Sequence, residues 1–256
     1  MRPLGAVAAA ALFGACAGGP APILELVPFH EARLRAVHLD TLDPAHHEEF
    51  VAARQEWLAA LAAEGRPPDG RGLFLELSDH RIWSLRPLRS MVDLEKRREP
   101  DDGERLKPAR KRYDDRSDAA LRPPHHNEIW AREPDLDFPG EDPALDEVSA
   151  GASRVVVEQL LPSPPHGDDY EAAWAEVKAA LQARRYPLRR VSYWSRYGSG
   201  KLITLWLAHS GEELKATPPP EELVSASVLE KWRSALASSE TLTARHRRDL
   251  SGAVVP

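Results

Sequence analysis

The chain has 256 residues, of which 42% are hydrophobic, and its formal net charge is −6 at pH 7. This is enough material for one large domain or two of ordinary size. Nucleic-acid binding normally requires a clustered basic face, and a net negative charge gives no sign of one, so we expect no nucleic-acid partner. Because Cys16 is the single cysteine, an intramolecular disulfide and a cysteine-based metal site are both excluded.

The first residues have the layout of a secretory signal. Arg2 precedes an apolar run over residues 4–15, which is too short to span a bilayer as a stable helix. The peptide Leu12-Phe13-Gly14-Ala15-Cys16 resembles a bacterial lipoprotein signal, although Phe13 stands where that family usually has Leu. The resemblance implies a signal at 1–15, lipid attachment at Cys16, a tether at 16–30 and a place on a membrane of the bacterial cell envelope, facing the periplasm or the exterior. An ordinary cleaved signal is the alternative.

A strand, a helix and a hairpin are predicted next. Residues 34–39 have the composition of a strand, and Asp43 and Pro44 suit the start of a helix. Apolar residues then recur with the period of a half-buried helix as far as Gly65, which can end it. Strands are predicted at 72–77 and 81–85, joined by a short turn.

The middle of the chain is dominated by charge. Residues 90–121 alternate in sign and contain Pro100 and Pro108, so we expect a broken helix or partial disorder there. An extended arm follows at Glu128-Ile129-Trp130. The first module is therefore placed at 31–140, with a charged insert at about 97–126.

The same series of elements recurs in the second half, at 150–252. Strands are predicted at 154–161, 191–197 and 201–207, with helices starting at Ser163 and covering 221–239, and an extended stretch near 240–250. The two halves align without a gap at an offset of 120 residues. Identical pairs include Val37/Val157, Pro44/Pro164, His46/His166, Glu56/Glu176, Pro67/Pro187 and Leu85/Leu205.

This element order predicts an α+β fold. Strand, helix, two strands, helix and a trailing strand make up the ferredoxin-like plan, which leaves one face of its sheet uncovered. Two tandem ferredoxin-like (βαββα) modules can cover these faces by closing sheet against sheet around a pseudo-two-fold axis. We therefore expect a monomer that is a pseudo-dimeric α/β barrel.

At this point the chain resembles the dimeric α/β-barrel superfamily, particularly proteins of the NIPSNAP and antibiotic-biosynthesis-monooxygenase type. The resemblance covers about residues 33–250 and includes the phrase Arg89-Ser90-Met91-Val92-Asp93-Leu94. It implies a cofactor-independent monooxygenase that acts on an aromatic or quinone-like substrate. Some relatives bind haem through a histidine, but no position here matches a ligand motif, so no cofactor is expected.

Strand alternation separates two sets of side chains. The predicted helix-covered set is apolar: Val37, Leu39, Leu73, Leu75, Leu77, Trp83 and Leu85. The opposite set is mixed polar and aromatic and is predicted to face the space between the sheets. Its candidate ligand-binding residues are His38, Phe74, Glu76, Arg86, Glu158, Trp194, Arg196 and Trp206.

Two interpretations of the mixed face remain open. In a small-molecule pocket, His38 would act as a base or hydrogen-bond donor, oriented by Glu76 or Glu158, while Arg86 or Arg196 holds an anionic ligand. In a docking network, the same groups would form buried ion pairs between the halves. No metal site is predicted at His46-His47 or His125-His126, because adjacent side chains diverge.

Two classes of function follow. The first is a membrane-tethered cell-envelope lipoprotein with a small-molecule binding or interaction role. The second is the cofactor-independent monooxygenase that the resemblance implies.

Overall fold

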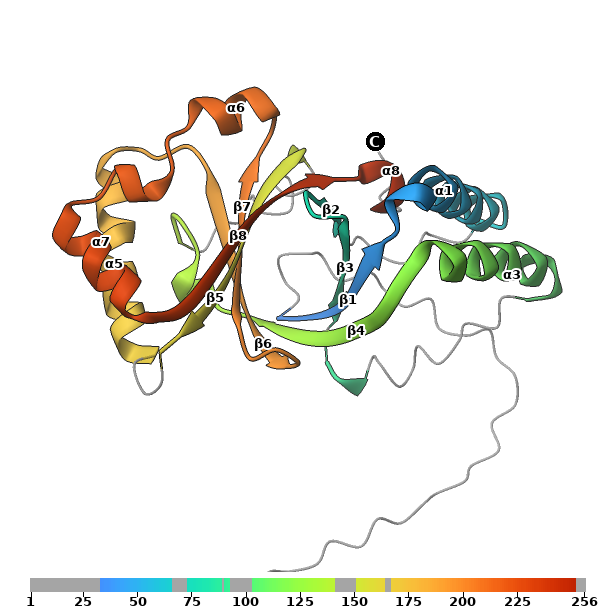
Figure 1. Cartoon of the computed structure of the whole chain (residues 1–256), viewed down its shortest axis with the longest axis horizontal. Coiled ribbons are helices and arrows are strands. Elements are labelled where there is room, and N and C mark those ends of the chain that lie inside the picture. The colour runs from blue at the N-terminus through green and yellow to red at the C-terminus, as the bar shows by residue number, and fades with distance from the viewer. Residues whose placement is uncertain are drawn as a thin grey trace, which may run out of the picture.

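Eight antiparallel strands form one closed barrel in the order β1-β3-β2-β8-β5-β7-β6-β4 (Figure 1). The computed structural model describes residues 33–65, 73–88, 90–92, 103–140, 151–163 and 167–251. The predicted signal, Cys16, the tether and half of the 89–94 phrase lie outside these residues.

Each half of the chain supplies four neighbouring strands of the barrel. The first half contains β1 (Leu34–Leu42), α1 (His47–Ala63), β2 (Leu73–Leu77), β3 (Arg81–Leu88), α3 (Gly103–Ala120) and β4 (Leu121–Arg132). The second contains β5 (Arg154–Pro162), α5 (Gly167–Ala183), β6 (Arg189–Tyr197), β7 (Leu202–Ala208), α6 (Gly211–Ala216), α7 (Ala226–Ser234), β8 (Leu236–His246) and α8 (Arg248–Ser251). The α+β prediction is confirmed, and β5 and α5 lie 120 residues after β1 and α1, as the repeat predicts.

The two halves meet edge to edge as well as face to face. The sequence predicts two sheets that only pack against each other, but β4 pairs with β6 and β8 pairs with β2. This pairing satisfies backbone groups that free strand edges would expose, so the segments predicted as arms or edge strands become interior members of the barrel.

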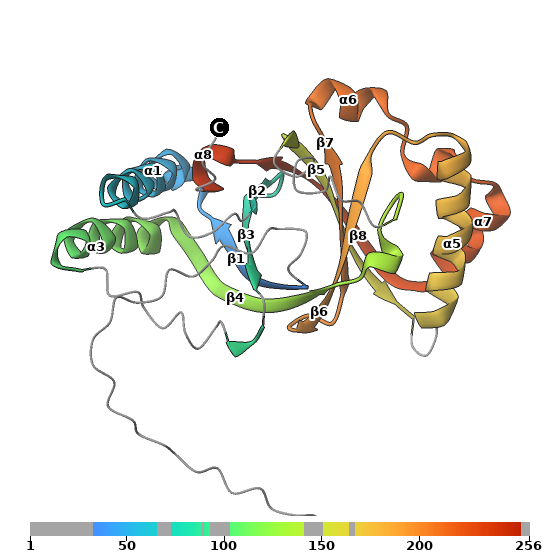
Figure 2. The same ribbon diagram turned by 180° about the vertical axis from the view of Figure 1, so that it is seen from behind.

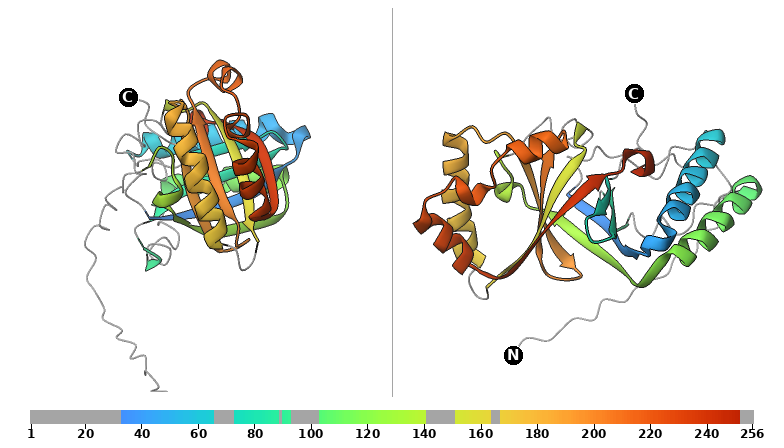
Figure 3. Two further views of the ribbon diagram at one scale, coloured as in Figure 1. Left: turned by 90° about the vertical axis from the view of Figure 1, so that its left-hand side faces the viewer. Right: turned by 45° about the horizontal axis from the view of Figure 1, so that its top comes forward.

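Helices cover the two opposite ends of the molecule. α1 packs beside α3 at one end, and α5 packs beside α7 at the other (Figures 1 and 2). Figure 3 shows α5 and α7 lying across the sheet of the second half. Among the helices that the structure describes, none is long and apolar enough to cross a membrane.

Helix starts and turns follow the sequence signals. The Asp43 side chain accepts a hydrogen bond from Ala45 N, and a short 3-10 turn at Pro44–His46 leads into α1. Gly65 has φ +65° just beyond α1, and Gly200 has φ +67° in the β6–β7 hairpin, both conformations that glycine adopts without strain.

Two helix predictions are wrong. In the charged segment predicted as broken, residues 103–120 form the continuous helix α3 with Pro108 inside it, while residues 93–102 lie outside the described residues. Leu106 packs with Trp57 and Leu61 of α1, and Arg110–Asp114 and Lys111–Asp115 pairs support the exposed side. The helix predicted at 221–239 ends at Ser234, because residues 236–246 are needed as β8 to close the barrel.

The faces of the strands are the reverse of the prediction. The set predicted to lie under the helices fills the barrel, where it forms one cluster with apolar residues from all eight strands. Phe74 instead stacks on Phe50 of α1, and Trp206 packs edge-on against Trp174 of α5. The interior of an eight-stranded barrel is only wide enough for closely packed side chains, and here it holds Leu, Val and Ile together with Trp83, Trp130 and Tyr193, while the helices cover an outer face that also carries aromatic residues.

A buried carboxylate fastens the β4–β6 seam. Glu128 is 8% exposed and accepts hydrogen bonds from Trp130 Nε1 (2.6 Å), Ser195 Oγ (2.8 Å) and Ser199 N (3.0 Å). Gly198, in the hairpin above it, has φ +150°, and a Cβ there would lie 2.5 Å from Glu128 Cδ. Because three donors hold the carboxylate, it cannot move aside cheaply.

We therefore expect Gly198→Ala to lower the free energy of unfolding by about 3 kcal/mol, through both backbone strain and overlap with Glu128. The control is Gly200→Ala, which has a positive φ but open space around its Cβ, and should cost only about 1 kcal/mol. Urea denaturation of the three proteins measures the difference. Equal losses in both variants would show that Glu128 does not constrain the hairpin.

Candidate functional site

The eight predicted ligand-binding residues lie on the outer face of the barrel, not in its interior. Three of them are packed aromatic residues: Phe74, Trp194 and Trp206. Glu158 is buried and accepts a hydrogen bond from Thr204, while Arg196 pairs with Glu133 at the surface (2.6 Å). The prediction that these residues share one space between the sheets is therefore wrong, since the strand faces are reversed.

His38 and Arg86 nevertheless line a cavity of about 500 Å³ on the outer face of the first half. α1 and α3 cover only one end of this face, where Leu42, Phe74 and Ile82 pack. Beyond that end the outward side chains stay half-buried. The cavity is lined by Ala36, Val37, His38, Ser84, Arg86, Asn127, Glu128, Ile129 and Tyr197.

Two of the lining residues, His38 and Asn127, belong to a cluster of four polar side chains beside the cavity. His38 Nε2 lies 3.0 Å from Asp40 Oδ2, and His125 Nδ1 lies 2.7 Å from Asp40 Oδ1. On its other side, His38 Nδ1 is 2.7 Å from Asn127 Oδ1. The two imidazole rings are nearly parallel, with an interplanar angle of 5°. Asp40 is thus held between two histidines.

The electrostatics of the cluster favour a positive charge on His38. The hydrogen bond to Asp40 raises the pKa of His38, while burial and the charge of Arg86 oppose this effect. Burial opposes the charged form of Asp40, but its hydrogen bonds with His38 and His125 outweigh burial and hold its pKa below the ordinary value.

Antiparallel pairing of β1 with β4 brings the cluster together. His38 pairs with Asn127 and Leu39 pairs with His126, so the next residues of the two strands, Asp40 and His125, come side by side before the register shifts ahead of the Thr41–Arg122 pair. By strand alternation His125 shares the face of Asn127, which is the outer face that also carries His38 and Asp40. The sequence analysis missed Asp40 and Asn127 and dismissed His125, yet the alternating patterns His38-x-Asp40 and His125-x-Asn127 were visible.

A second, more open depression of about 860 Å³ lies at the β2–β8–β5 seam, beside α1 and α8. Its lining is rich in basic side chains, including Arg154, Arg245, Arg247 and Arg248. Residues from α1 that line it are His47, Glu48 and Val51.

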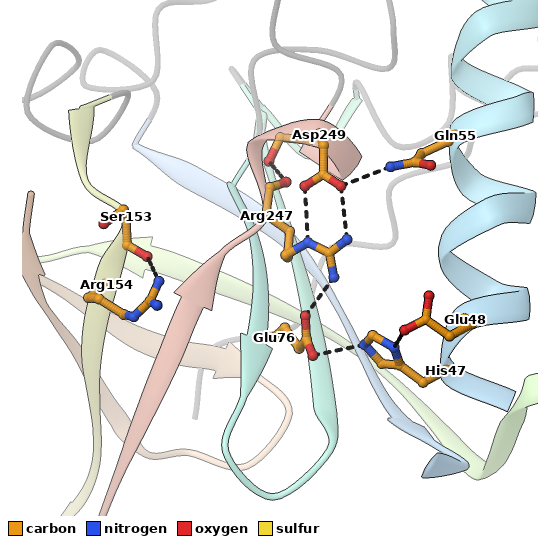
Figure 4. A network of polar contacts seen from close by, with 9 residues as sticks. His47, Glu48, Gln55, Glu76, Ser153, Arg154, Arg247 and Asp249 are labelled. Carbon is orange, nitrogen blue, oxygen red and sulfur yellow. Dashed lines mark hydrogen bonds and ion pairs between the residues drawn. The ribbon is translucent and has the colours of Figure 1, made fainter. Parts of the chain in front are cut away.

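Arg247 is the centre of an ion-pair network at this seam (Figure 4). Its guanidinium donates to Glu76 Oε2 (2.7 Å) and to Asp249 Oδ2 (2.8 Å). Glu76 Oε1 lies 2.9 Å from His47 Nε2, and Gln55 donates to Asp249 (3.0 Å). The network therefore links α1, β2, β8 and α8, which is the docking role that the sequence analysis left open for Glu76.

Comparison with known proteins shows likeness in fold only. No protein-family model and no curated protein matches the chain. A crystal structure of a protein provisionally designated a monooxygenase from Lactobacillus acidophilus aligns over 83% of this chain and 93% of its own, with 6% identity and a TM-score of 0.50. A similarly designated protein from Fusobacterium nucleatum aligns over 84% and 92%, with 6% identity and a TM-score of 0.54. The chain therefore has the dimeric α/β-barrel fold that these proteins share.

The seam network makes stability depend on pH. Burial opposes the charged form of Glu76, but hydrogen bonds to Arg247 and His47 lower its pKa, and the hydrogen bond to Arg247 lowers the pKa of Asp249. A carboxyl group whose pKa is lower in the folded than in the unfolded protein stabilises the fold at every pH above its unfolded pKa, which is about 4.5 for Glu. This stabilisation is lost as the pH falls from there through the folded pKa. Glu76→Gln should cost about 1–2 kcal/mol at pH 7 and less at pH 3, measured by urea denaturation. The control is Glu104→Gln at an exposed site, which should lower the free energy of unfolding by under about 0.5 kcal/mol. If the loss of stability in Glu76→Gln were the same at pH 3 and pH 7, the stabilising role of the network would be contradicted.

Proposed function

We propose that the outer-face cavity of the first half binds a small aromatic molecule that carries an acidic group. The observation behind this proposal is the position of Arg86 in a cavity that apolar and aromatic side chains also line. A volume of about 500 Å³ lies within the range of pockets that enclose small organic ligands. Arg86 on β3 pairs with Ala36 on β1, two residues before His38, so both groups line the cavity from neighbouring strands.

The lining suits a flat ligand with one anionic end. Ala36, Val37 and Ile129 supply apolar contacts, and the Tyr197 ring, which is 64% exposed, offers an aromatic wall. Ser84 and Asn127 add hydrogen-bonding groups near the charged end. Glu128 also lines the cavity, but its carboxylate is engaged by Trp130, Ser195 and Ser199. Arg86 carries a permanent positive charge, which makes it the group expected to meet an anion.

The internal repeat supports a role of Arg86 in binding. Position 86 corresponds to Trp206 in the second half, where the side chain packs in the core beneath α5. A helix-covered face is thus stable with an aromatic residue at this position. The arginine in the first half is not required by the fold, which favours a role in binding.

Arg86→Ala should weaken binding of 1-naphthoate by about tenfold or more, because a charge-assisted hydrogen bond contributes about 1.5–3 kcal/mol. Isothermal titration calorimetry of the full chain measures this, with the neutral methyl ester as a probe that should be insensitive to the substitution. Arg81→Ala is the matched control on β3, since Arg81 pairs with Asp79 and Glu240 and does not line the cavity. Equal affinity of wild type and Arg86→Ala for naphthoate would overturn the proposal.

The second candidate is a cofactor-independent monooxygenase-like reaction in the same cavity. The likeness in fold to the two provisionally designated monooxygenases favours it. A substrate such as anthrone can itself reduce dioxygen. Its methylene carbon becomes a carbonyl with one oxygen atom, and the two hydrogens leave with the other as water. Oxygen uptake with anthrone that exceeds the protein-free rate, and that falls in Arg86→Ala but not in Arg81→Ala, would favour catalysis over binding alone.

We further propose that the halves are tandem ferredoxin-like units of one monomer. Their strand orders, β4-β1-β3-β2 and β8-β5-β7-β6, match each other position by position. Each unit also has one helix after its first strand and at least one more helix before its last strand. Two such units joined within one chain would do what two subunits do in a symmetric dimer.

Tethering to the cell envelope is a separate proposal that rests on the sequence. Cys16 is the sole cysteine and follows the apolar run of a signal. Mass spectrometry of membrane-extracted protein should find Cys16 as an acylated N-terminal residue, and Cys16→Ser should move the protein to the soluble fraction. An unmodified N-terminus at another residue, or equal solubility of wild type and Cys16→Ser, would contradict lipid anchoring.

A further inference from the structure

We propose that His38, Asp40 and His125 form a binding site for a divalent transition-metal ion, with Asn127 as a supporting residue. This inference goes beyond the proposed function and does not rest on it, since Asp40 and His125 do not line the cavity. The ligand set of two imidazoles and one carboxylate is typical of Zn²⁺, Fe²⁺ and related ions.

The ligand atoms lie close enough together for small side-chain movements to place them around one ion. Ligand atoms that each lie about 2.1 Å from one ion are about 3.0–3.4 Å apart in octahedral or tetrahedral geometry. His38 Nε2 and Asp40 Oδ2 are already 3.0 Å apart, and His125 Nδ1 and Asp40 Oδ1 are 2.7 Å apart. All three residues offer ligand atoms within 4.8 Å of one another.

The hydrogen bond to Asn127 orients His38 as a ligand. Because Asn127 Oδ1 can only accept, Nδ1 of His38 carries the proton, and Nε2 points at the carboxylate of Asp40. Two acceptor atoms that face each other at 3.0 Å need a cation between them, which is either a proton or a metal ion. A second ring nitrogen held by an amide or carboxylate oxygen is the usual arrangement of metal-binding histidines.

Burial and access both suit a metal. The Asp40 side chain is 8% exposed, so its charge is poorly solvated and gains from a close cation. The His38 and His125 side chains are 39% and 41% exposed, which leaves a route for an ion and room for water ligands.

The repeat again acts as an internal control. Position 40 corresponds to Leu160, which packs in the apolar cluster beneath α5. Position 38 corresponds to Glu158, which is buried beside Thr204. The strand position of Asp40 therefore accepts an apolar residue, Leu160, in the second half without loss of the fold. The fold alone does not explain why the first half buries an acid there, and a bound metal ion would explain it.

The test is titration of the untagged, chelator-treated full chain with Co²⁺ and Zn²⁺. We expect one Co²⁺ per chain, with d–d absorption bands in the visible range, and displacement of Co²⁺ by Zn²⁺. His125→Ala and the near-isosteric Asp40→Asn should each weaken binding at least tenfold, and Asn127→Ala should weaken it about 10-fold to 100-fold. Circular dichroism and thermal melting establish that each variant is folded.

His126→Ala is the matched control, because His126 is the exposed neighbour of His125 but is not among the candidate ligands. It should bind Co²⁺ as tightly as wild type. A wild-type protein that binds neither ion more tightly than Asp40→Asn would overturn the proposal, and so would equal losses in His126→Ala and His125→Ala. Naphthoate plays no part in this titration, so its outcome is separate from that of the Arg86 experiment.

Discussion

Closure of the sheet is the constraint on which the rest of the structure depends. Two four-stranded sheets would each expose two unpaired edges, and pairing β2 with β8 and β4 with β6 removes all of them. The closed interior is narrow and is filled by aliphatic side chains together with Trp130 and Tyr193. Because little room remains for a ligand inside, polar side chains that could serve binding are placed on the outer face.

The two halves use their outer faces differently. In the second half, Arg190 stacks on Trp174 (3.6 Å) and donates to Tyr170 (2.8 Å), and Trp206 and Trp194 complete an aromatic layer beneath α5. In the first half, α1 and α3 cover one end of the sheet only. The duplicated plan thus combines a closely packed half with a half that retains a cavity and a polar cluster beside it.

Strand boundaries and turns were predictable because they depend on local chemistry. Asp43 and Pro44 start a helix wherever they occur in such a context, and the glycines at 198 and 200 define a hairpin. The face assignment failed because large apolar side chains occur on both faces of these strands, so hydrophobicity alone does not separate interior from exterior. Leu75 and Phe74 are both buried, and only their neighbours show which one lies inside the barrel. His125 was dismissed because its partner Asp40 is 85 residues away and adjacent only through the pairing of β1 with β4.

The sequence by itself determined the element order, the α+β class and the 120-residue repeat, since these follow from periodicity and turn chemistry. It also predicted His38 and Arg86 as polar groups on a common strand face. Only the tertiary structure decided which face lies inside, how the last strand of each half crosses to the other half, and that His38, Asp40 and His125 meet. These features depend on pairing between strands far apart in the chain, which local sequence patterns do not specify.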